Sequence, residues 1–150
     1  MSIRSLPLII FAFIFYNVVV LLGSSDSGNA ESILRSVFFS LPSFRSGAAE
    51  GADAVRWTFT WGDLIILVTM FLLFVEILKA TYTSTASLLD HGLSMLVFIA
   101  CLVEFLLVDA AYTSVFFLLM VATLIDVVAG YTIGIRVARR DIGFGGGADL

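Results

Sequence analysis

Four long apolar stretches limit what this chain can fold into more than any other feature. Each approaches the length of about 20 residues that an α-helix needs to cross the hydrocarbon core of a bilayer. None of them alternates polar and apolar residues as barrel strands do, so helices must satisfy the backbone hydrogen bonds in lipid. The stretches are Leu6–Leu22, Leu64–Ala80, Leu88–Val108 and Tyr112–Ile135. We therefore expect an all-α protein, a bundle of four transmembrane helices.

The composition favours one membrane domain and excludes several classes of protein. Charged residues make up 13% of the 150 residues, whereas soluble domains average about 25%. We expect residues 1–150 to form a single integral membrane domain. The net charge of −4 comes without a basic cluster, so we expect no binding of nucleic acid. The single cysteine, Cys101, can form neither an internal disulfide nor a CxxC pair.

The distribution of basic residues predicts the orientation in the membrane. Lysine and arginine gather on the cytoplasmic side of membrane proteins, and one side of this chain carries Arg4, Lys79, Arg136, Arg139 and Arg140. Both termini are therefore predicted to be cytoplasmic, with residues 24–60 forming an outer loop. The first stretch has features of a cleavable signal peptide, but it is longer than a usual signal core. We expect it to remain as the first helix.

The outer loop contains a predicted helix of its own. Asn29 can cap a helix that ends at Pro42, since apolar residues repeat at helical spacing between them. We expect a short interfacial helix on the outer leaflet; a lid on the outer end of the bundle remains the alternative. Aromatic residues favour the membrane boundary, so we expect interfacial positions for Trp57, Trp61 and Tyr112. The glycine-rich tail 141–150 is predicted to be disordered.

Polar residues inside the apolar stretches are predicted to meet near the middle of the membrane. At a rise of about 1.5 Å per residue, Asn17 lies roughly 16 Å from the cytoplasmic side, and Thr69 and Asp126 lie about 15 Å from it. Ser94 of the third stretch is close to the same level. We expect these four residues to form a buried polar layer in which Asn17 or Thr69 donates a hydrogen bond to Asp126. Its role, helix packing or proton relay, stays open.

Two further carboxylates lie inside the stretches. A carboxylate in hydrocarbon costs at least about 2.5 kcal/mol, so it requires a partner or a function. Glu76 comes three residues before Lys79, which suits an ion pair at the inner interface. Glu104 is expected close to the outer surface. In the fourth stretch Gly130 and Gly134 follow Asp126 at steps of four, the small-residue pattern of packed transmembrane helices.

Cofactor and catalytic motifs are missing. Asp90 is expected to cap a third helix that begins at His91, and both residues to be interfacial. His91 is the single histidine; a haem or pigment site there would need a flat apolar cleft and usually a second axial group. One histidine and one cysteine cannot build a structural zinc site. No HExxH, GxSxG or phosphate-binding glycine loop occurs. We expect no enzymatic activity, no metal and no cofactor.

Part of the chain resembles other sequences, and this resemblance predicts where the protein is located in the cell. The stretch Leu88–Phe98 with its continuation Glu104–Val108, the pair Ile125-Asp126 and the segment Arg136–Asp141 resemble a family of small proteobacterial four-helix membrane proteins. The resemblance covers the last three stretches. It implies a bacterial inner-membrane location and carries over no activity.

These observations favour a non-catalytic accessory or assembly subunit of a larger bacterial inner-membrane complex. Its expected partners are the lipid bilayer and other membrane subunits, or a second copy of itself. Two alternatives stay open: a proton or small-cation transport protein that uses the buried carboxylates, and a pigment- or haem-binding subunit that uses His91.

Overall fold

The protein is mostly helical, with one small sheet. The computed structural model describes residues 6–23, 29–42, 55–81 and 86–143. In chain order the elements are α1 (Ile9–Gly23), α2 (Ala30–Arg35), β1 (Val37–Pro42), β2 (Val55–Thr60), α3 (Trp61–Ala80), α4 (Ala86–Leu107), the 3₁₀ turn η4 (Asp109–Ala111) and α5 (Ser114–Gly143). The prediction of an all-α fold is therefore wrong in one respect, the two-stranded sheet.

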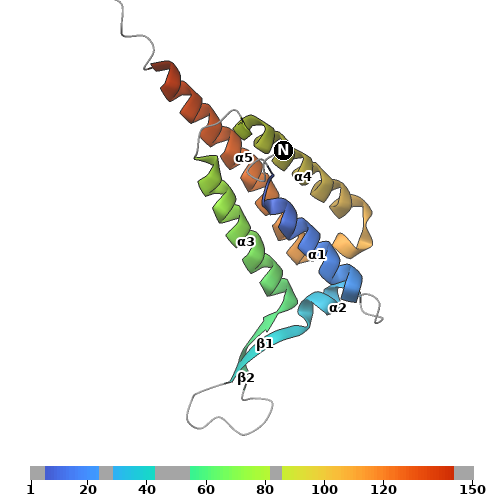
Figure 1. The fold of residues 1–150 in the computed structure, drawn as a ribbon. Coiled ribbons are helices and arrows are strands. Elements are labelled where there is room, and N and C mark those ends of the chain that lie inside the picture. The colour runs from blue at the N-terminus through green and yellow to red at the C-terminus, as the bar shows by residue number, and fades with distance from the viewer. Residues whose placement is uncertain (1–5, 24–28, 43–54, 82–85, 144–150) are drawn as a thin grey trace, which may run out of the picture.

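The four long helices lie side by side and alternate in direction (Figure 1). α5 packs against α3 and α4, and α1 contacts all three of them. The start of α1 and the end of α5 lie at one end of the bundle, which we call the termini end. The sheet and α2, which contacts η4, lie at the opposite end, which we call the sheet end.

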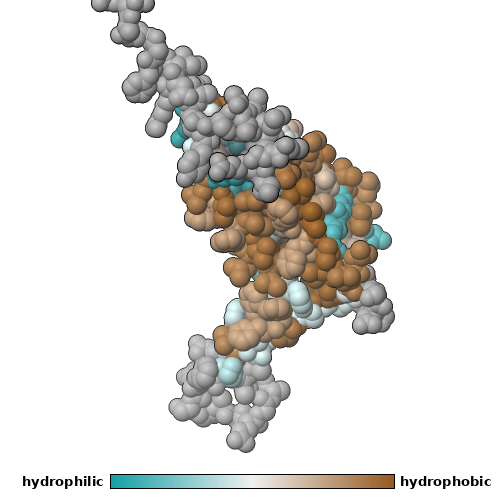
Figure 2. Space-filling model, viewed as in Figure 1, coloured by the Kyte–Doolittle hydropathy of each residue, from teal (hydrophilic) through white to brown (hydrophobic). Residues whose placement is uncertain are grey.

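Two helices are long and apolar enough to cross a membrane. They are α3, with a mean hydropathy of 2.2, and the Ser114–Arg136 part of α5, with 2.1. The apolar stretches Ile9–Gly23 and His91–Leu107 are shorter. Only 22% of the apolar window of α3 is buried inside the protein, so most of its apolar side chains point outwards. Figure 2 shows a broad hydrophobic surface over the helices, interrupted on the right of the view by a hydrophilic patch.

The start of α3 is fixed by a capping box. The hydroxyl of Thr60 accepts the main-chain N–H of Asp63 at 3.2 Å, and the Asp63 carboxylate accepts the main-chain N–H of Thr60 at 2.9 Å. Such a reciprocal pair satisfies two donors that the first helical turn leaves open. The helix therefore begins at Trp61, directly after β2, three residues before the predicted apolar stretch.

The predicted interfacial helix is present only in part. Asn29 caps α2 as expected, but the helix ends at Arg35 and the chain continues as strand β1 from Val37. β1 pairs antiparallel with β2. Val37, Phe38 and Phe39 favour strands over helices because of their branched and aromatic side chains. The partner strand β2 begins at Val55, outside the window in which helical spacing was counted. The helical spacing of the apolar residues therefore gave the wrong element.

Two other predicted boundaries differ from the structure. α4 begins at Ala86, so Asp90 lies inside the helix and does not cap it; its side chain lies outside the described residues. α5 continues to Gly143, so positions 141–143 of the predicted tail are helical. Residues 144–150 lie outside the described part of the chain.

Aromatic rings build the core near the sheet end. Phe116 of α5 is fully buried and lies edge-on to Tyr16 at 4.8 Å and to Phe13 at 6.3 Å between ring centroids. The ring of Phe105 of α4 lies parallel to that of Phe116, at 6.4 Å between ring centroids. One ring thereby joins α1, α4 and α5.

Candidate functional site

Three of the four residues of the predicted polar layer are buried. Thr69 is 1% exposed, Ser94 2% and Asp126 4%. Asn17 on α1 is half-buried. Together with Glu76, His91 and Thr123, the three buried members place polar groups on the inner faces of α3, α4 and α5.

The inner stripes of α4 and α5 bring Ser94 and Asp126 to one level. On α4 the buried residues His91 and Ser94 are three apart, and on α5 the buried residues Asp126 and Gly130 are four apart. The two helices run in opposite directions, and His91 contacts Gly130. One turn further along α4 is Ser94, and one turn back along α5 is Asp126. The packing therefore sets a hydroxyl and a carboxyl at the same height in the bundle.

The imidazole of His91 lies directly on the glycines of α5. A Cβ added at Gly130 would overlap with Nδ1 and lie 2.7 Å from Cε1, and one at Gly134 would lie 3.7 Å from Nε2. The Tyr131 ring is 5.8 Å away. The two glycines thus make room for the His91 side chain. The small-residue pattern had instead predicted a close approach of two helix backbones. His91 is 6% exposed and lies inside the bundle; its interfacial depth in a membrane stays a prediction.

The predicted donation to Asp126 is wrong for both proposed donors. The Asn17 amide donates to the main-chain oxygen of Phe13 at 3.2 Å and to Glu104 Oε2 at 3.4 Å. The Thr69 hydroxyl donates to the main-chain oxygen of Ile65 at 2.7 Å, a common bond of threonine within its own helix. Depth along the helices placed these residues at one level, but it gave no information on the direction in which each side chain points.

Asn17 and Glu104 lie on the surface where α1 meets α4. Both side chains are half-buried, in a part of the protein otherwise covered by apolar residues. Towards the termini end the same two helices border an apolar groove of about 230 Å³, lined by Leu6, Pro7, Ile10, Phe13, Leu93, Leu96, Val97 and Ala100. We call the groove together with Asn17 and Glu104 the α1–α4 seam. The seam thus combines an apolar surface groove with the hydrogen-bonded carboxylate of Glu104.

Glu76 fixes the start of α1. Its predicted ion pair with Lys79 is present at 2.9 Å. In addition, Glu76 Oε2 accepts the main-chain N–H of Leu8 at 2.6 Å, and Lys79 Nζ donates to the main-chain oxygen of Leu6 at 2.9 Å. A carboxylate at a helix N-terminus satisfies an open donor and opposes the positive end of the helix dipole. The cluster is a structural clamp between α1 and α3.

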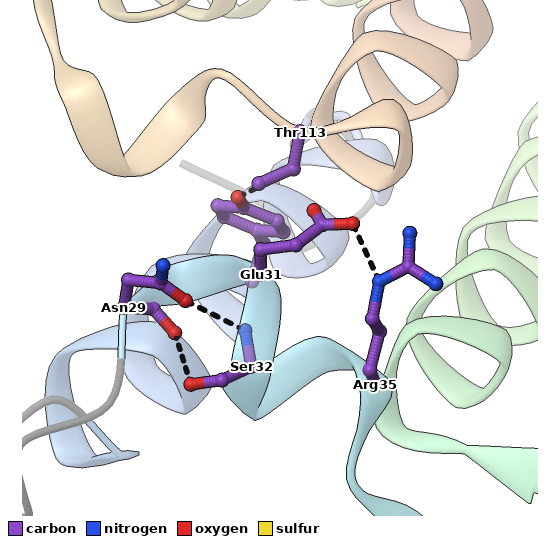
Figure 3. A network of polar contacts seen from close by, with 6 residues as sticks. Asn29, Glu31, Ser32, Arg35 and Thr113 are labelled. Atoms are coloured by element: carbon purple, nitrogen blue, oxygen red, sulfur yellow. Dashed lines mark hydrogen bonds and ion pairs between the residues drawn. The ribbon is translucent and has the colours of Figure 1, made fainter.

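Tyr16 makes a second clamp, which sequence reasoning did not find. Its hydroxyl, on a residue 1% exposed, donates to the main-chain oxygen of Ala110 at 2.7 Å and lies 2.8 Å from the hydroxyl of Thr113. Figure 3 shows Thr113 near α2, where the Asn29 side chain accepts the main-chain N–H of Ser32 and Glu31 pairs with Arg35. A tyrosine in the middle of an apolar stretch is the one signal that pointed to this contact, because a buried phenol normally finds a partner.

The three aromatic residues that were predicted to be interfacial lie at the sheet end. Tyr112 is 59% exposed and donates to the main-chain oxygen of Leu106 at 3.1 Å. Trp57 is exposed on β2, and Trp61 is half-buried at the start of α3. In the described part of the chain, no three of His, Cys, Asp and Glu gather to hold a metal ion.

Comparison of the chain with protein-family models, curated proteins and solved structures finds no match. The resemblance to small proteobacterial membrane proteins therefore stays a prediction.

Proposed function

We propose that the chain is a four-span bacterial inner-membrane protein that serves as a non-catalytic subunit of a larger membrane complex. Both termini are cytoplasmic in this proposal, and the sheet end faces outwards. A transmembrane helix of the partner packs against the α1–α4 seam.

The observation that carries the proposal is the half-buried hydrogen bond between Asn17 and Glu104. Other polar side chains are used inside the protein: Glu76 binds the start of α1, Tyr16 joins α1 to η4, and His91 packs on α5. The Asn17–Glu104 pair instead lies at the outer surface of the bundle, which faces lipid when the four helices cross the membrane. A carboxylate there is costly without a donor, and polar side chains commonly hydrogen-bond across packed transmembrane helices.

The test is copurification from mild detergent. The tagged wild-type chain is compared with Glu104→Leu, which removes the carboxylate, and with Glu104→Gln, which keeps an acceptor. Glu31→Gln is the matched control, because Glu31 forms an exposed pair with Arg35 on α2. We expect a stoichiometric membrane partner with wild type and Glu31→Gln, and a loss of at least several-fold with Glu104→Leu. Native mass spectrometry tells a second copy from a different subunit.

Two results count against this function. One is a chain that migrates alone at every detergent ratio. The other is full retention of the partner by Glu104→Leu while the variant remains folded.

A second candidate, proton or small-cation transport, rests on the shared level of Ser94 and Asp126 inside the bundle. Both residues are buried on helices that pack together, and buried carboxyls commonly mark proton paths in membrane proteins. The test is flux into liposomes, with wild type against Asp126→Asn. Equal flux, or none in either, removes this candidate.

Haem or pigment binding receives less support. The His91 ring packs against Gly130 and Gly134, the place where a cofactor ring would need an apolar cleft. A visible absorption spectrum of the purified protein tests it directly.

A further inference from the structure

The hairpin of β1 and β2 has one aromatic face and one hydroxyl face. Residues directly opposite each other in an antiparallel pair point to the same side. Phe39 lies opposite Phe59, and Leu41 opposite Trp57, whereas Ser40 lies opposite Thr58 on the other side. A bulge between Val37 and Phe39 brings in Phe38, whose ring contacts those of Phe59 and Trp61. We call the side formed by Phe38, Phe39, Leu41, Trp57 and Phe59 the aromatic face.

The aromatic face is open to the surroundings. Phe38, Phe39 and Trp57 are each about half exposed, at 51%, 50% and 50%. All six residues of β1 are exposed, so within the described chain no second layer covers this strand. A two-stranded hairpin is marginally stable in water at best, and large apolar surfaces of this kind mark contact sites.

The hairpin lies where a membrane boundary is expected. β2 ends at Thr60 and α3 begins at Trp61, and α3 is one of the two helices long and apolar enough to cross a membrane. In Figure 1 the hairpin turns sideways from the end of α3 instead of continuing its axis. A strand of six residues covers about 20 Å, so the hairpin can extend along a bilayer surface.

We propose that the aromatic face lies in the boundary between headgroups and acyl chains of the outer leaflet, next to the start of α3. This inference rests on the membrane placement of α3 in the proposed function. Tryptophan and other amphipathic aromatic rings favour this layer. The opposite face, with the hydroxyls of Ser40 and Thr58, points to water. A lipid boundary suits this surface because among the side chains of the aromatic face only the indole of Trp57 carries a hydrogen-bonding group.

The two tryptophans of the chain, Trp57 and Trp61, allow a direct test. The full-length chain is reconstituted into phosphatidylcholine vesicles as Trp61→Phe, which leaves Trp57 as the single reporter. Trp57→Phe is the matched control and reports on the start of α3. Each is measured with lipids brominated near the headgroup end of the acyl chain, with lipids brominated near its tail, and with aqueous iodide.

We expect blue-shifted emission from Trp57 and quenching by the shallow bromolipid several-fold stronger than by the deep bromolipid or by iodide. Red-shifted emission that iodide quenches and bromolipids leave unchanged overturns the inference, since the face then lies in water. Emission protected from all three quenchers also overturns it, because the face is then covered by protein. The control separates the two proposals. If bromolipids quench Trp61 but not Trp57, only the hairpin inference fails; if they quench neither, the membrane placement of α3 fails as well.

Discussion

The carboxylate of Glu76, near the end of α3, accepts the main-chain N–H of Leu8 at the start of α1 at 2.6 Å. The two residues are 68 positions apart in the chain, so this bond fixes the position of α1 along the axis of α3. Lys79 supports it from the next turn, through Glu76 and the main-chain oxygen of Leu6. The termini end of the bundle is thus held by one carboxylate that caps a helix other than its own.

Glu76→Ala is expected to destabilise the protein by about 1.5–3 kcal/mol, the usual effect of losing a hydrogen bond to a charged group. The Leu8 N–H loses its acceptor, and the Lys79 ammonium loses one acceptor while it keeps the main-chain oxygen of Leu6. Glu76→Gln keeps an acceptor for Leu8 but loses the charge, so we expect a smaller loss. Thermal unfolding in detergent measures both. Equal midpoints for wild type and Glu76→Ala would show that the bond does not hold α1.

Gly130→Ala is expected to destabilise by about 1–3 kcal/mol, because an added methyl group overpacks a filled site. The new Cβ would overlap with the His91 ring. Gly92→Ala on α4 is the matched control: its Cβ would meet nothing within 4 Å. Since alanine favours helices over glycine by about 1 kcal/mol, we expect the control to be neutral or slightly more stable.

The double variant Gly130→Ala/His91→Ala isolates the contact. If the imidazole is what the methyl group meets, Gly130→Ala costs much less in the His91→Ala background. Residues in direct contact show such non-additivity, of about 0.5–3 kcal/mol. Strictly additive effects in unfolding experiments would contradict the packing of His91 on Gly130.

Tyr16→Phe is expected to lower stability by about 1–3 kcal/mol, because the part-buried oxygen of Ala110 loses its donor and the Thr113 hydroxyl loses one of its two partners. The lost hydroxyl contacts the main-chain oxygen of Ala110 and the side chain of Thr113. Tyr112→Phe is the control, since Tyr112 is 59% exposed and water can donate to the exposed main-chain oxygen of Leu106 in place of the lost hydroxyl. The difference between their unfolding midpoints is the readout; equal effects would argue against the clamp.

The long helices could be predicted from hydrophobicity alone, and the hairpin could not. The predicted stretches Leu64–Ala80 and Leu88–Val108 agree with α3 and α4 to within a few residues, because the spanning length depends on local composition. The strand from Val37 depends on its pairing with β2, far along the chain. Apolar residues between Ile33 and Leu41 also repeat at helical spacing, and this repeat outweighed the strand preference of Val37, Phe38 and Phe39.

The site residues divide in the same way. Spacing along one helix predicted the pair of Glu76 with Lys79, because both partners belong to α3. The partners of Asn17 and Tyr16 lie on other elements, and their choice depends on how each helix rotates about its axis. Depth along a helix can be counted from the sequence, but rotation is determined by packing against the neighbours.

The central claim, that α4 crosses the membrane as part of a four-span protein, is tested most directly by the sidedness of two exposed residues. Asp109 follows α4 and Thr81 follows α3, and both are exposed. Cysteines are placed at each site, one at a time, in a Cys101→Ala background, since Cys101 is the single native cysteine. Intact spheroplasts are then labelled with a membrane-impermeant maleimide. We predict labelling of Asp109→Cys in intact spheroplasts and of Thr81→Cys only after lysis. Labelling of both from the same side would mean that α4 does not cross, and would contradict the four-span account.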